Sequence, residues 1–309
     1  MIYKIVKTYW KRFLIGILIA ILPLMFIDNW LPYALLSHYN FNVDSQPTLL
    51  NKFNADLEDI SFQTDDGVEI SGWWIPAPKF SSDSQILQNP TLIVLHSLGG
   101  TRQDFLNFYL PIWQKGFNLT LIDMRGHGNS GGKYFTYGFH ERKDISKLID
   151  YLQDKKQVNN QKIAIMGISA GGTVAILSAN YDKRIQALVS IAAFADLDQT
   201  ITKQVPWLPL FWKKRVLKKA EKIAKFKIAE ISPVKQIKKL DCPIFIVHGT
   251  ADKYIPFING QKLYDAAKSE KLLYPIKDAD HSTMLDKGGK ELQNQIVKFL
   301  QNSLKSKTT

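Results

Sequence analysis

The sequence predicts an α/β fold with a mostly parallel eight-stranded sheet and helices on both faces. From residue 91 onward, short apolar runs alternate with longer stretches of helical character. Several runs are almost continuously apolar, such as 91–96 (TLIVLH) and 244–249 (IFIVHG). Parallel strands covered by helices on both sides have this character, because neither face meets water. Strands that alternate with helices in this way predict an α/β sheet, and the first two strands, with no helix between them, predict an antiparallel edge.

The elements follow in order along the chain. The predicted strands are 57–63, 68–75, 91–96, 118–123, 162–167, 185–192, 243–248 and 271–276. The turn sequence Asp-Asp-Gly at 65–67 joins the first two strands and predicts an antiparallel hairpin. The predicted helices are about 102–115, 139–156, 170–180, 259–270 and 288–303.

An insertion interrupts this alternation between the sixth and seventh strands. About fifty residues lie there, far more than a simple crossover needs. They include the aromatic stretch 205–212 (VPWLPLFW) and the lysine-rich stretch 213–227. We expect residues of about 197–240 to form a cap over the edge of the sheet.

The N-terminal region carries a membrane-anchor pattern. Residues 13–27 (FLIGILIAILPLMFI) hold no charged side chain, Trp10 and Trp30 bracket them, and 31–36 extend the apolar character. About 20 residues cross the hydrocarbon core of a bilayer, and tryptophans favour its interfaces. The sequence therefore predicts a single-pass anchor at 1–36.

Charge around this segment predicts its orientation. Four cations precede residue 13, and none follows the segment until Lys52. The positive-inside rule then places the N-terminus in the cytoplasm and the rest of the chain outside, at the cell membrane. We expect a linker at 37–56 and the α/β domain at 57–309. Two alternatives stay open, a cleaved signal peptide, although no small-x-small site follows Ile27, and a buried helix of the domain.

The distribution of positive charge bears on whether the protein binds nucleic acid or a membrane. The net charge of +12 is local, because residues 201–240 hold twelve lysines and arginines against two glutamates. No zinc-finger spacing or RNA-binding aromatic motif accompanies it, so we expect no nucleic-acid partner. The basic, aromatic cap suits an anionic membrane surface, and the alternative is a solvated basic helix with one face on the core. The single cysteine, Cys242, excludes an intrachain disulfide.

The segment 167–171 (GISAG) carries the strongest chemical signal. This G-x-S-x-G follows an apolar strand and opens an apolar helix, the context of a nucleophile elbow. The sharp turn would lift Ser169 above the sheet, and the N-terminus of the helix behind it favours negative charge. Ser169 is therefore the predicted nucleophile.

A serine needs a base, and two polar residues follow later strands at matching places. Asp252 follows the seventh strand and His281 follows the eighth. In this fold class the chain order is serine, then acid, then histidine. We expect His281 to act as the base and Asp252 to orient it, with Asp278 and Asp280 as competing carboxylates nearby.

The oxyanion of an acyl-transfer intermediate needs two backbone donors. One is expected from Ala170, directly after the nucleophile, and the other from Leu98 in the loop 96–100 (HSLGG). The six histidines lack paired metal-ligand spacing, and no dinucleotide or Walker glycine pattern occurs, so we predict neither metal nor cofactor.

Residues 57–300 resemble the α/β-hydrolase superfamily, including its single-pass membrane-anchored esterase-like members. The matching motifs are HSLGG (96–100), DMRGHGNSGG (123–132), GISAGG (167–172), HGTADKYIP (248–256), the histidine loop DADHS (278–282) and the edge hairpin ISGWWIP (70–76). The resemblance implies that Asp123, Arg125, His127 and Gly128 build a structural turn. Similar enzymes carry glycine where this chain has Ser97, which bears on the shape of the oxyanion loop.

These observations predict a serine hydrolase that cleaves carboxylic esters or thioesters of small or lipid-like acyl substrates through an acyl-enzyme. One alternative is a serine peptidase of prolyl-oligopeptidase type, although no propeller-sized region precedes the domain. The other is a non-catalytic, membrane-tethered binding protein on the same fold. Acyl-chain length and oligomeric state do not follow from the sequence.

Overall fold

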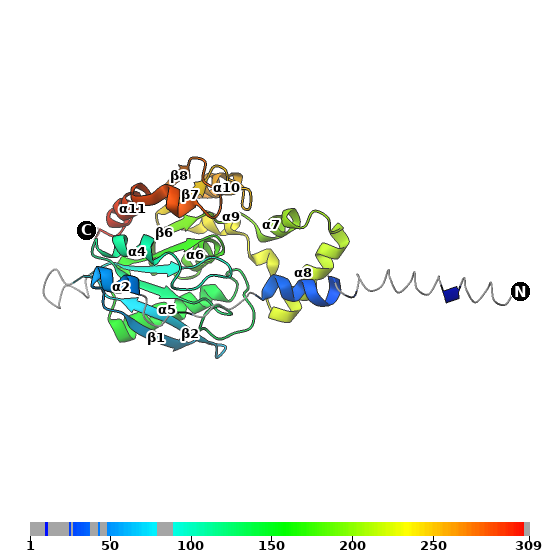
Figure 1. Cartoon of the computed structure of the whole chain (residues 1–309), viewed down its shortest axis with the longest axis horizontal. Helices are drawn as coiled ribbons and strands as arrows, with labels where there is room; N and C mark the ends of the chain where they lie inside the picture. The colour runs from blue at the N-terminus through cyan, green and yellow to red at the C-terminus, as the bar shows by residue number, and fades with distance from the viewer. Residues whose placement is uncertain are drawn as a thin grey trace, which may run out of the picture.

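The computed structural model describes residues 10, 11, 25, 27–37, 43, 48–78 and 89–305. Its centre is one eight-stranded sheet flanked by helices (Figure 1). The strands are β1 (Glu58–Gln63), β2 (Glu69–Ile75), β3 (Thr91–Leu95), β4 (Asn118–Ile122), β5 (Ile163–Ile168), β6 (Ile185–Ile191), β7 (Ile244–Gly249) and β8 (Lys271–Ile276). The helices are α2 (Thr48–Phe53), α4 (Leu106–Trp113), α5 (Glu141–Lys156), α6 (Ala170–Tyr181), α7 (Leu197–Gln204), α8 (Leu210–Ala224), α9 (Pro233–Gln236), α10 (Ile258–Ala266) and α11 (Met284–Ser303), with short 3₁₀ turns at Asn160–Lys162, Ile228–Glu230 and Ile237–Lys239.

The sheet has the predicted mixed topology. Its strand order is β1-β2-β4-β3-β5-β6-β7-β8. The pairs β1/β2 and β2/β4 are antiparallel, and the pairs from β4 to β8 are parallel. The parallel strands therefore end at one edge, which is where ligand sites of open α/β sheets lie.

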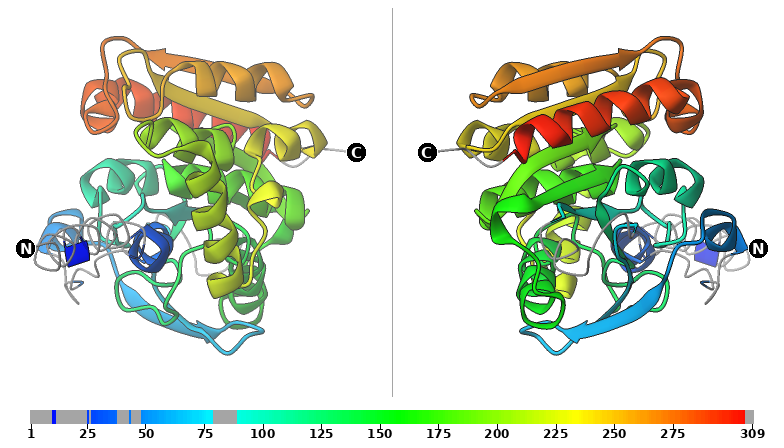
Figure 2. Two further views of the ribbon diagram at one scale, coloured as in Figure 1. Left: turned by 90° about the vertical axis from the view of Figure 1, so that its right-hand side faces the viewer. Right: turned by 90° about the vertical axis from the view of Figure 1, so that its left-hand side faces the viewer.

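Each face of the sheet has its own hydrophobic core. In β3, Ile93 and Leu95 pack in one core, while Leu92 and Val94 pack in the other. The first core includes side chains from α5 and α6, and the second includes side chains from α4 and α11. The two views in Figure 2 show these helices on the two sides of the sheet. This burial on both faces explains why the strand sequences are almost continuously apolar.

Some helix boundaries differ from the prediction. Helix α4 begins at Leu106 rather than at about 102. The preceding loop is fixed by Asp123, whose Oδ1 accepts from the backbone N–H of Arg102 at 2.7 Å. Helix α11 begins earlier than predicted, at Met284, and is bent at Gly289 (φ 47°, ψ −143°).

The loop after β4 has the structural character that the motif implied. Asp123 is fully buried and also accepts from the backbone N–H of Asn129 at 2.9 Å. The Arg125 guanidinium donates to the buried Asp144 of α5. These bonds tie the loop to the body of the domain.

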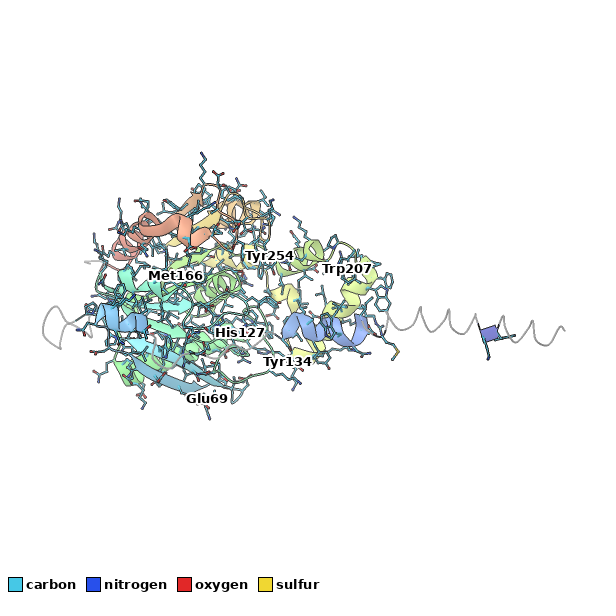
Figure 3. All side chains as sticks on the ribbon, in the orientation of Figure 1. Glu69, His127, Tyr134, Met166, Trp207 and Tyr254 are labelled. Atoms are coloured by element: carbon cyan, nitrogen blue, oxygen red, sulfur yellow. The ribbon has the colours of Figure 1, made fainter. Side chains whose placement is uncertain are left out.

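The insertion between β6 and β7 is helical. It begins with α7 and α8 and ends with α9, which packs against α6 and α10. In Figure 1, α7 and α8 extend from the sheet toward the side on which helical residues 27–36 lie. Trp207, between α7 and α8, lies at the far end of this projection (Figure 3).

Most of the predicted membrane anchor lies outside the described residues. Of residues 13–27, only 25 and 27 are described. Within the described ranges, no helix is both long enough and apolar enough to cross a membrane. Residues 27–36 are helical, and Leu36 at their end is fully buried in the domain core. The predicted linker 37–56 contains α2, with Leu50 in the second core.

Candidate active site

Ser169 occupies a sharp turn between β5 and α6. Its backbone angles, φ 56° and ψ −116°, are unusual for a non-glycine residue. A Cβ at Gly167 would lie 2.1 Å from the carbonyl oxygen of Gly171, and one at Gly171 would lie 2.4 Å from the carbonyl oxygen of His96. Any side chain at either position would therefore clash with backbone. The motif of small residues is what allows the strand to turn so tightly into the helix.

The structure brings Ser169, His281 and Asp252 together in one hydrogen-bonded line. The distance from His281 Nε2 to Ser169 Oγ is 2.9 Å, and that from His281 Nδ1 to Asp252 Oδ2 is 2.7 Å. Ser169 follows β5, Asp252 follows β7 and His281 follows β8, all at the carboxyl edge of the sheet. A base within hydrogen-bond reach of a hydroxyl, and oriented by a carboxylate, is the geometry of nucleophilic acyl transfer.

Asp252 is held by its own loop. It is only 4% exposed, and its Oδ1 accepts from the backbone N–H groups of Tyr254 at 2.9 Å and Ile255 at 2.7 Å. The remaining oxygen, Oδ2, faces the imidazole of His281. The carboxylate thus has one oxygen fixed by backbone and the other free to orient the base.

The competing carboxylates have other partners. Asp280 Oδ1 accepts from the backbone N–H groups of Ser282 and Thr283, each at 3.0 Å. The Ser282 hydroxyl also donates to this oxygen at 2.9 Å, and that bond is the main cause that lowers the pKa of Asp280 below its ordinary value. Asp278 is an exposed turn residue with φ 53°. Among these three carboxylates, Asp252 is the one that accepts a hydrogen bond from His281 Nδ1.

Two further side chains, Tyr254 and His248, lie against this line. The Tyr254 ring lies over the His281 imidazole, with ring centroids 5.0 Å apart. The fully buried His248 lies behind Asp252, and its Nε2 donates to the carbonyl oxygen of Ile255 at 2.7 Å. Burial lowers the pKa of His248, so the ring is neutral and serves to fix the loop. Both positions occur in the sequence HGTADKYIP, which gave no signal for these contacts.

Leu98 and Ala170, the predicted oxyanion donors, line the same cavity as Ser169. Neither backbone N–H has an acceptor among the described residues. Ala170 is the first residue of α6, whose first-turn N–H groups have no partner within the helix. Two free donors beside a nucleophile can stabilise the negative oxygen of a tetrahedral intermediate.

Two buried histidines support the loop of Leu98. His127 Nε2 accepts from the backbone N–H of Gly99 at 3.2 Å, and His96 Nε2 accepts from that of Met124 at 2.9 Å. Their rings are 4.9 Å apart between centroids. His127 is thus a packed, hydrogen-bonded loop residue, as its motif implied, and it acts through backbone rather than on a substrate.

Burial of these rings predicts a loss of stability in acid. Desolvation lowers the pKa of His96 to about 3, against about 6.5 in an unfolded chain. Below pH 6.5 the unfolded chain therefore binds a proton that the folded protein does not, so the free energy of unfolding falls as the pH falls toward 3. For His96 alone, we expect a loss of about 2 kcal/mol between pH 7 and pH 5.

Urea unfolding at the two pH values measures this effect. His96→Asn keeps one donor and one acceptor but does not titrate, so its loss between pH 7 and pH 5 should be smaller by about 2 kcal/mol. Groups that titrate elsewhere, such as the buried Asp144, whose pKa burial raises to about 6, cancel in this comparison. If the free energy of unfolding fell equally in the two proteins, His96 would not be the cause of the loss in acid.

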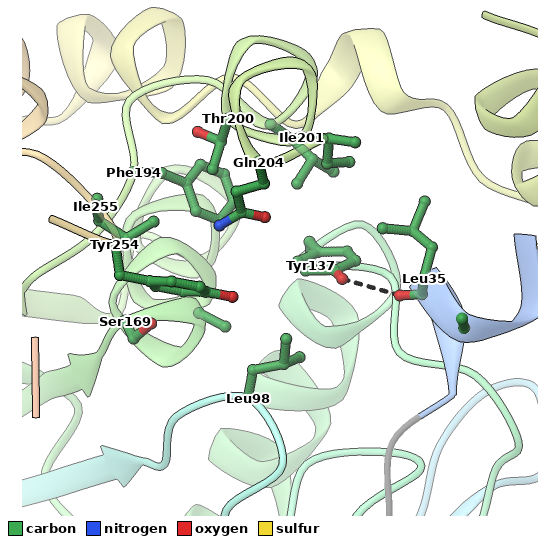
Figure 4. A pocket seen from close by; sticks show the side chains of 13 residues that line it. Leu35, Leu98, Tyr137, Ser169, Phe194, Thr200, Ile201, Gln204, Tyr254 and Ile255 are labelled. Carbon is green, nitrogen blue, oxygen red and sulfur yellow. Dashed lines mark hydrogen bonds between the residues drawn. The ribbon is translucent and has the colours of Figure 1, made fainter. Parts of the chain in front are cut away.

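The cavity at Ser169 has a volume of about 330 Å³. Ser169, Ala170 and Leu98 form one end of it, and Phe194, α7 and the helix 27–36 form the other walls (Figure 4). The Oη of Tyr137 donates to the carbonyl oxygen of Leu35 at 2.9 Å. No charged side chain occurs among the described residues that line the cavity. The site therefore favours a neutral, largely apolar group next to the serine.

The described residues include no cluster of histidine, cysteine, aspartate or glutamate suited to a metal ion. Burial raises the pKa of the Cys242 thiol to about 11, so it is protonated at neutral pH.

Comparison with known proteins finds relatives that match most of the chain. The chain is 26% identical over 318 residues to the uncharacterized protein YfhR of Salmonella typhimurium, covering 98% of both chains. It is 26% identical over 250 residues to the uncharacterized protein YqkD of Bacillus subtilis, covering 76% of both.

Solved structures share the fold. The esterase Pf2001 of Pyrococcus furiosus superposes with a TM-score of 0.69 at 23% identity, covering 87% of this chain and 99% of the esterase. Acetyl xylan esterase 1 of a Thermoanaerobacterium species gives a TM-score of 0.62 at 18% identity, covering 88% and 87%. The model of the prolyl oligopeptidase family matches residues 104–307, which is more than half of the sequence. The chain therefore belongs to the prolyl oligopeptidase family, a family of serine hydrolases with the α/β-hydrolase fold.

Proposed function

We propose that this protein hydrolyses carboxylic esters or thioesters of acyl substrates through a covalent acyl-enzyme. Ser169 is the nucleophile, His281 the general base and acid, and Asp252 the residue that orients His281. The backbone N–H groups of Leu98 and Ala170 form the oxyanion hole. The observation that carries the proposal is the unbroken line of hydrogen bonds from Asp252 through His281 to Ser169.

The reaction proceeds in two halves. Ser169 Oγ attacks the carbonyl carbon while its proton passes to His281 Nε2, and the carbonyl oxygen becomes the oxyanion. Collapse of this intermediate breaks the bond to the leaving alkoxide or thiolate, which takes the proton from His281. Water then attacks the acyl carbon and gives a proton to His281, and the acid leaves as Ser169 regains that proton.

A peptidase is the second candidate, and the name of the family favours it. A serine peptidase uses the same three side chains, so the distinction lies in the binding site. The described residues that line the Ser169 cavity offer no charged group to hold a peptide terminus. A cavity next to the serine that is lined by uncharged side chains, among them Leu98, Phe194 and Ile201, instead suits a neutral acyl group.

The test compares esters with amides on the same enzyme. We expect p-nitrophenyl butyrate to be hydrolysed with a burst of p-nitrophenol, because acylation releases the alcohol before water releases the acid. A fluorophosphonate should add once per chain. Faster turnover of aminoacyl p-nitroanilides than of the esters would favour the peptidase, and the absence of both labelling and turnover would favour a binding protein.

We also propose that residues 1–36 tether the enzyme to the cell membrane, with the catalytic domain outside the cytoplasm. The support is the apolar stretch 13–27, its flanking tryptophans and the cations before it. Protease added to intact cells should then remove the domain, and full protection of the domain would contradict this orientation. N-terminal sequencing of the membrane-bound protein distinguishes an anchor from a cleaved signal.

The basic surface of α8 predicts an effect of charge on substrates presented in membranes. Lys214, Lys218 and Lys222 are exposed, whereas Lys213 is buried and donates to the carbonyl oxygen of Thr202. Lys213 is thus excluded from the basic surface. Replacing the three exposed lysines with glutamate should weaken hydrolysis of esters in anionic vesicles about tenfold or more, because each cation contributes about 1 kcal/mol there. Hydrolysis of p-nitrophenyl butyrate should change little, and equal losses on both substrates would reject the idea.

A further inference from the structure

A second cavity adjoins the cavity at Ser169. It has a volume of about 200 Å³ and shares four wall residues with the first, namely Ala34, Leu35, Ile201 and Gln204. We call the cavity at Ser169 the proximal chamber and the second cavity the distal chamber. The shared residues come from the helix 27–36 and from α7, so both chambers lie along the same two elements (Figure 4).

The helix 27–36 is fixed in place as a wall of these chambers. At one end, the Arg215 guanidinium of α8 donates to both carboxylate oxygens of Asp28, each at 2.6 Å. At the other end, the carbonyl oxygen of Leu36 accepts from the backbone N–H of Phe135 at 2.9 Å, and the Leu36 side chain is fully buried. A segment of the chain far from the catalytic motifs therefore completes the substrate site.

The distal chamber is lined almost entirely by apolar side chains. Leu31 comes from the helix 27–36, Leu208 from the turn before α8, and Val216 and Leu217 from α8. Among the described residues that line it, Lys213 carries the one charge. Its ammonium is hydrogen-bonded to the carbonyl oxygen of Thr202 at 2.9 Å, so only its alkyl stem remains for a ligand. A chamber of this composition binds hydrocarbon.

We propose that the two chambers form one channel that binds the alkyl chain of the substrate's acyl group, so that the enzyme selects long-chain over short-chain acyl esters. The proposal rests on the function proposed above. The acyl group is the half of the substrate that remains on Ser169 through both halves of the reaction. Burial of its chain between three packed elements stabilises the attack and the acyl-enzyme alike, whereas the alcohol must leave after the first step.

The outer end of the channel supports a lipid-like substrate. Leu208 lines the distal chamber. Near it, Trp207 in the same turn and Leu210 at the start of α8 are 66% and 59% exposed. Phe211 beside them is 64% exposed. The apolar lining thus continues into apolar residues on the surface, where an alkyl chain can enter from a lipid phase.

The proposal is tested with esters of increasing acyl-chain length, on the wild-type protein and on variants in which a large side chain blocks the distal chamber. For the wild-type protein, kcat/KM for p-nitrophenyl esters below their micelle-forming concentrations should rise from butyrate to decanoate by about 100-fold or more. Burial of each methylene contributes up to about a fourfold increase. Val205→Trp and Leu31→Trp place a large side chain in the distal chamber from two different segments of the chain. Each should lower the decanoate-to-butyrate ratio by about 30-fold or more.

The control variant is Lys203→Trp, which places the same side chain on the exposed face of α7, outside both linings. It should keep the wild-type ratio. A second substrate series consists of acetates of long alcohols. Their kcat/KM should show no comparable increase with the length of the alcohol.

The outcomes separate this proposal from the function on which it rests. Three results would overturn the channel alone. They are hydrolysis of butyrate with no higher kcat/KM for decanoate, a kcat/KM that rises with the length of the alcohol instead, and an unchanged decanoate-to-butyrate ratio in both blocked variants. Failure to hydrolyse any ester, or to react with a fluorophosphonate, would overturn the proposed function. If one blocked variant hydrolyses neither ester, its rate of fluorophosphonate labelling shows whether the active site is intact, and the other blocked variant tests the channel. Equal losses of kcat/KM for decanoate and butyrate in both variants would also overturn the channel.

Discussion

Replacing Ser169 with alanine is expected to lower kcat/KM for p-nitrophenyl butyrate by about 10⁵-fold or more. Alanine lacks the oxygen that forms the bond to the acyl carbon, so the acyl-enzyme cannot form, and His281 has no proton to accept. The remaining activity should come from the oxyanion donors and from binding alone. The fluorophosphonate label should disappear together with the activity.

The control for this variant is Ser282→Ala, which removes an exposed hydroxyl next to His281 in the sequence. That hydroxyl donates to Asp280 and not to the base. Its loss should change kcat/KM by less than about threefold and leave the label in place. Retention of more than a tenth of the wild-type activity by Ser169→Ala, in protein free of wild-type contamination, would refute the assigned nucleophile.

The strands were predictable because their signal is local. A buried parallel strand must be apolar along its whole length, as Leu92, Ile93 and Val94 are, and helices must separate such strands. That the candidate catalytic residues lie close together was predictable for a related reason, because parallel strands end at one edge of the sheet. Ser169, Asp252 and His281 therefore meet although they lie in three separate loops.

The wall of the substrate site depends on long-range packing, and no local pattern indicates it. The apolar character of residues 31–36 suits a membrane helix and a buried helix equally well. In the structure, Leu36 packs in the core and Leu35 lines the cavity. The pair of Asp28 with Arg215 joins residues 187 positions apart. Only the folded chain shows that these residues belong to the site.

For a similar reason, the contact between His96 and His127 was not predictable, although the motif implied a structural role for His127. His96 and His127 end up 4.9 Å apart between ring centroids because β3 and β4 are neighbours in the sheet. The strand order places β4 next to both β2 and β3, and sequence patterns do not fix that order. His96 and His127 are neutral partners of backbone N–H groups because they are deeply buried, and only the packed structure defines that burial.

Replacing Asp252 with asparagine is expected to lower kcat/KM by about 10⁴-fold at pH 7 with little change in stability. The reason lies in the fixed loop around this side chain. The backbone N–H groups of Tyr254 and Ile255 both donate to Oδ1, so the amide oxygen of asparagine must take that position. The amide nitrogen then faces His281 Nδ1, where it donates a proton rather than accepting one.

This forces the imidazole into the wrong tautomer. Nδ1 becomes the acceptor and Nε2 carries the proton, so the nitrogen that lies 2.9 Å from Ser169 Oγ cannot take the proton of the hydroxyl. Asp280→Asn is the matched control, because Asp280 is also a carboxylate of this edge but binds the backbone of its own loop. It should retain activity within about threefold. An Asp252→Asn protein that keeps a tenth of the wild-type kcat/KM would show that Asp252 does not set the tautomer of the base, and the mechanism would need another carboxylate.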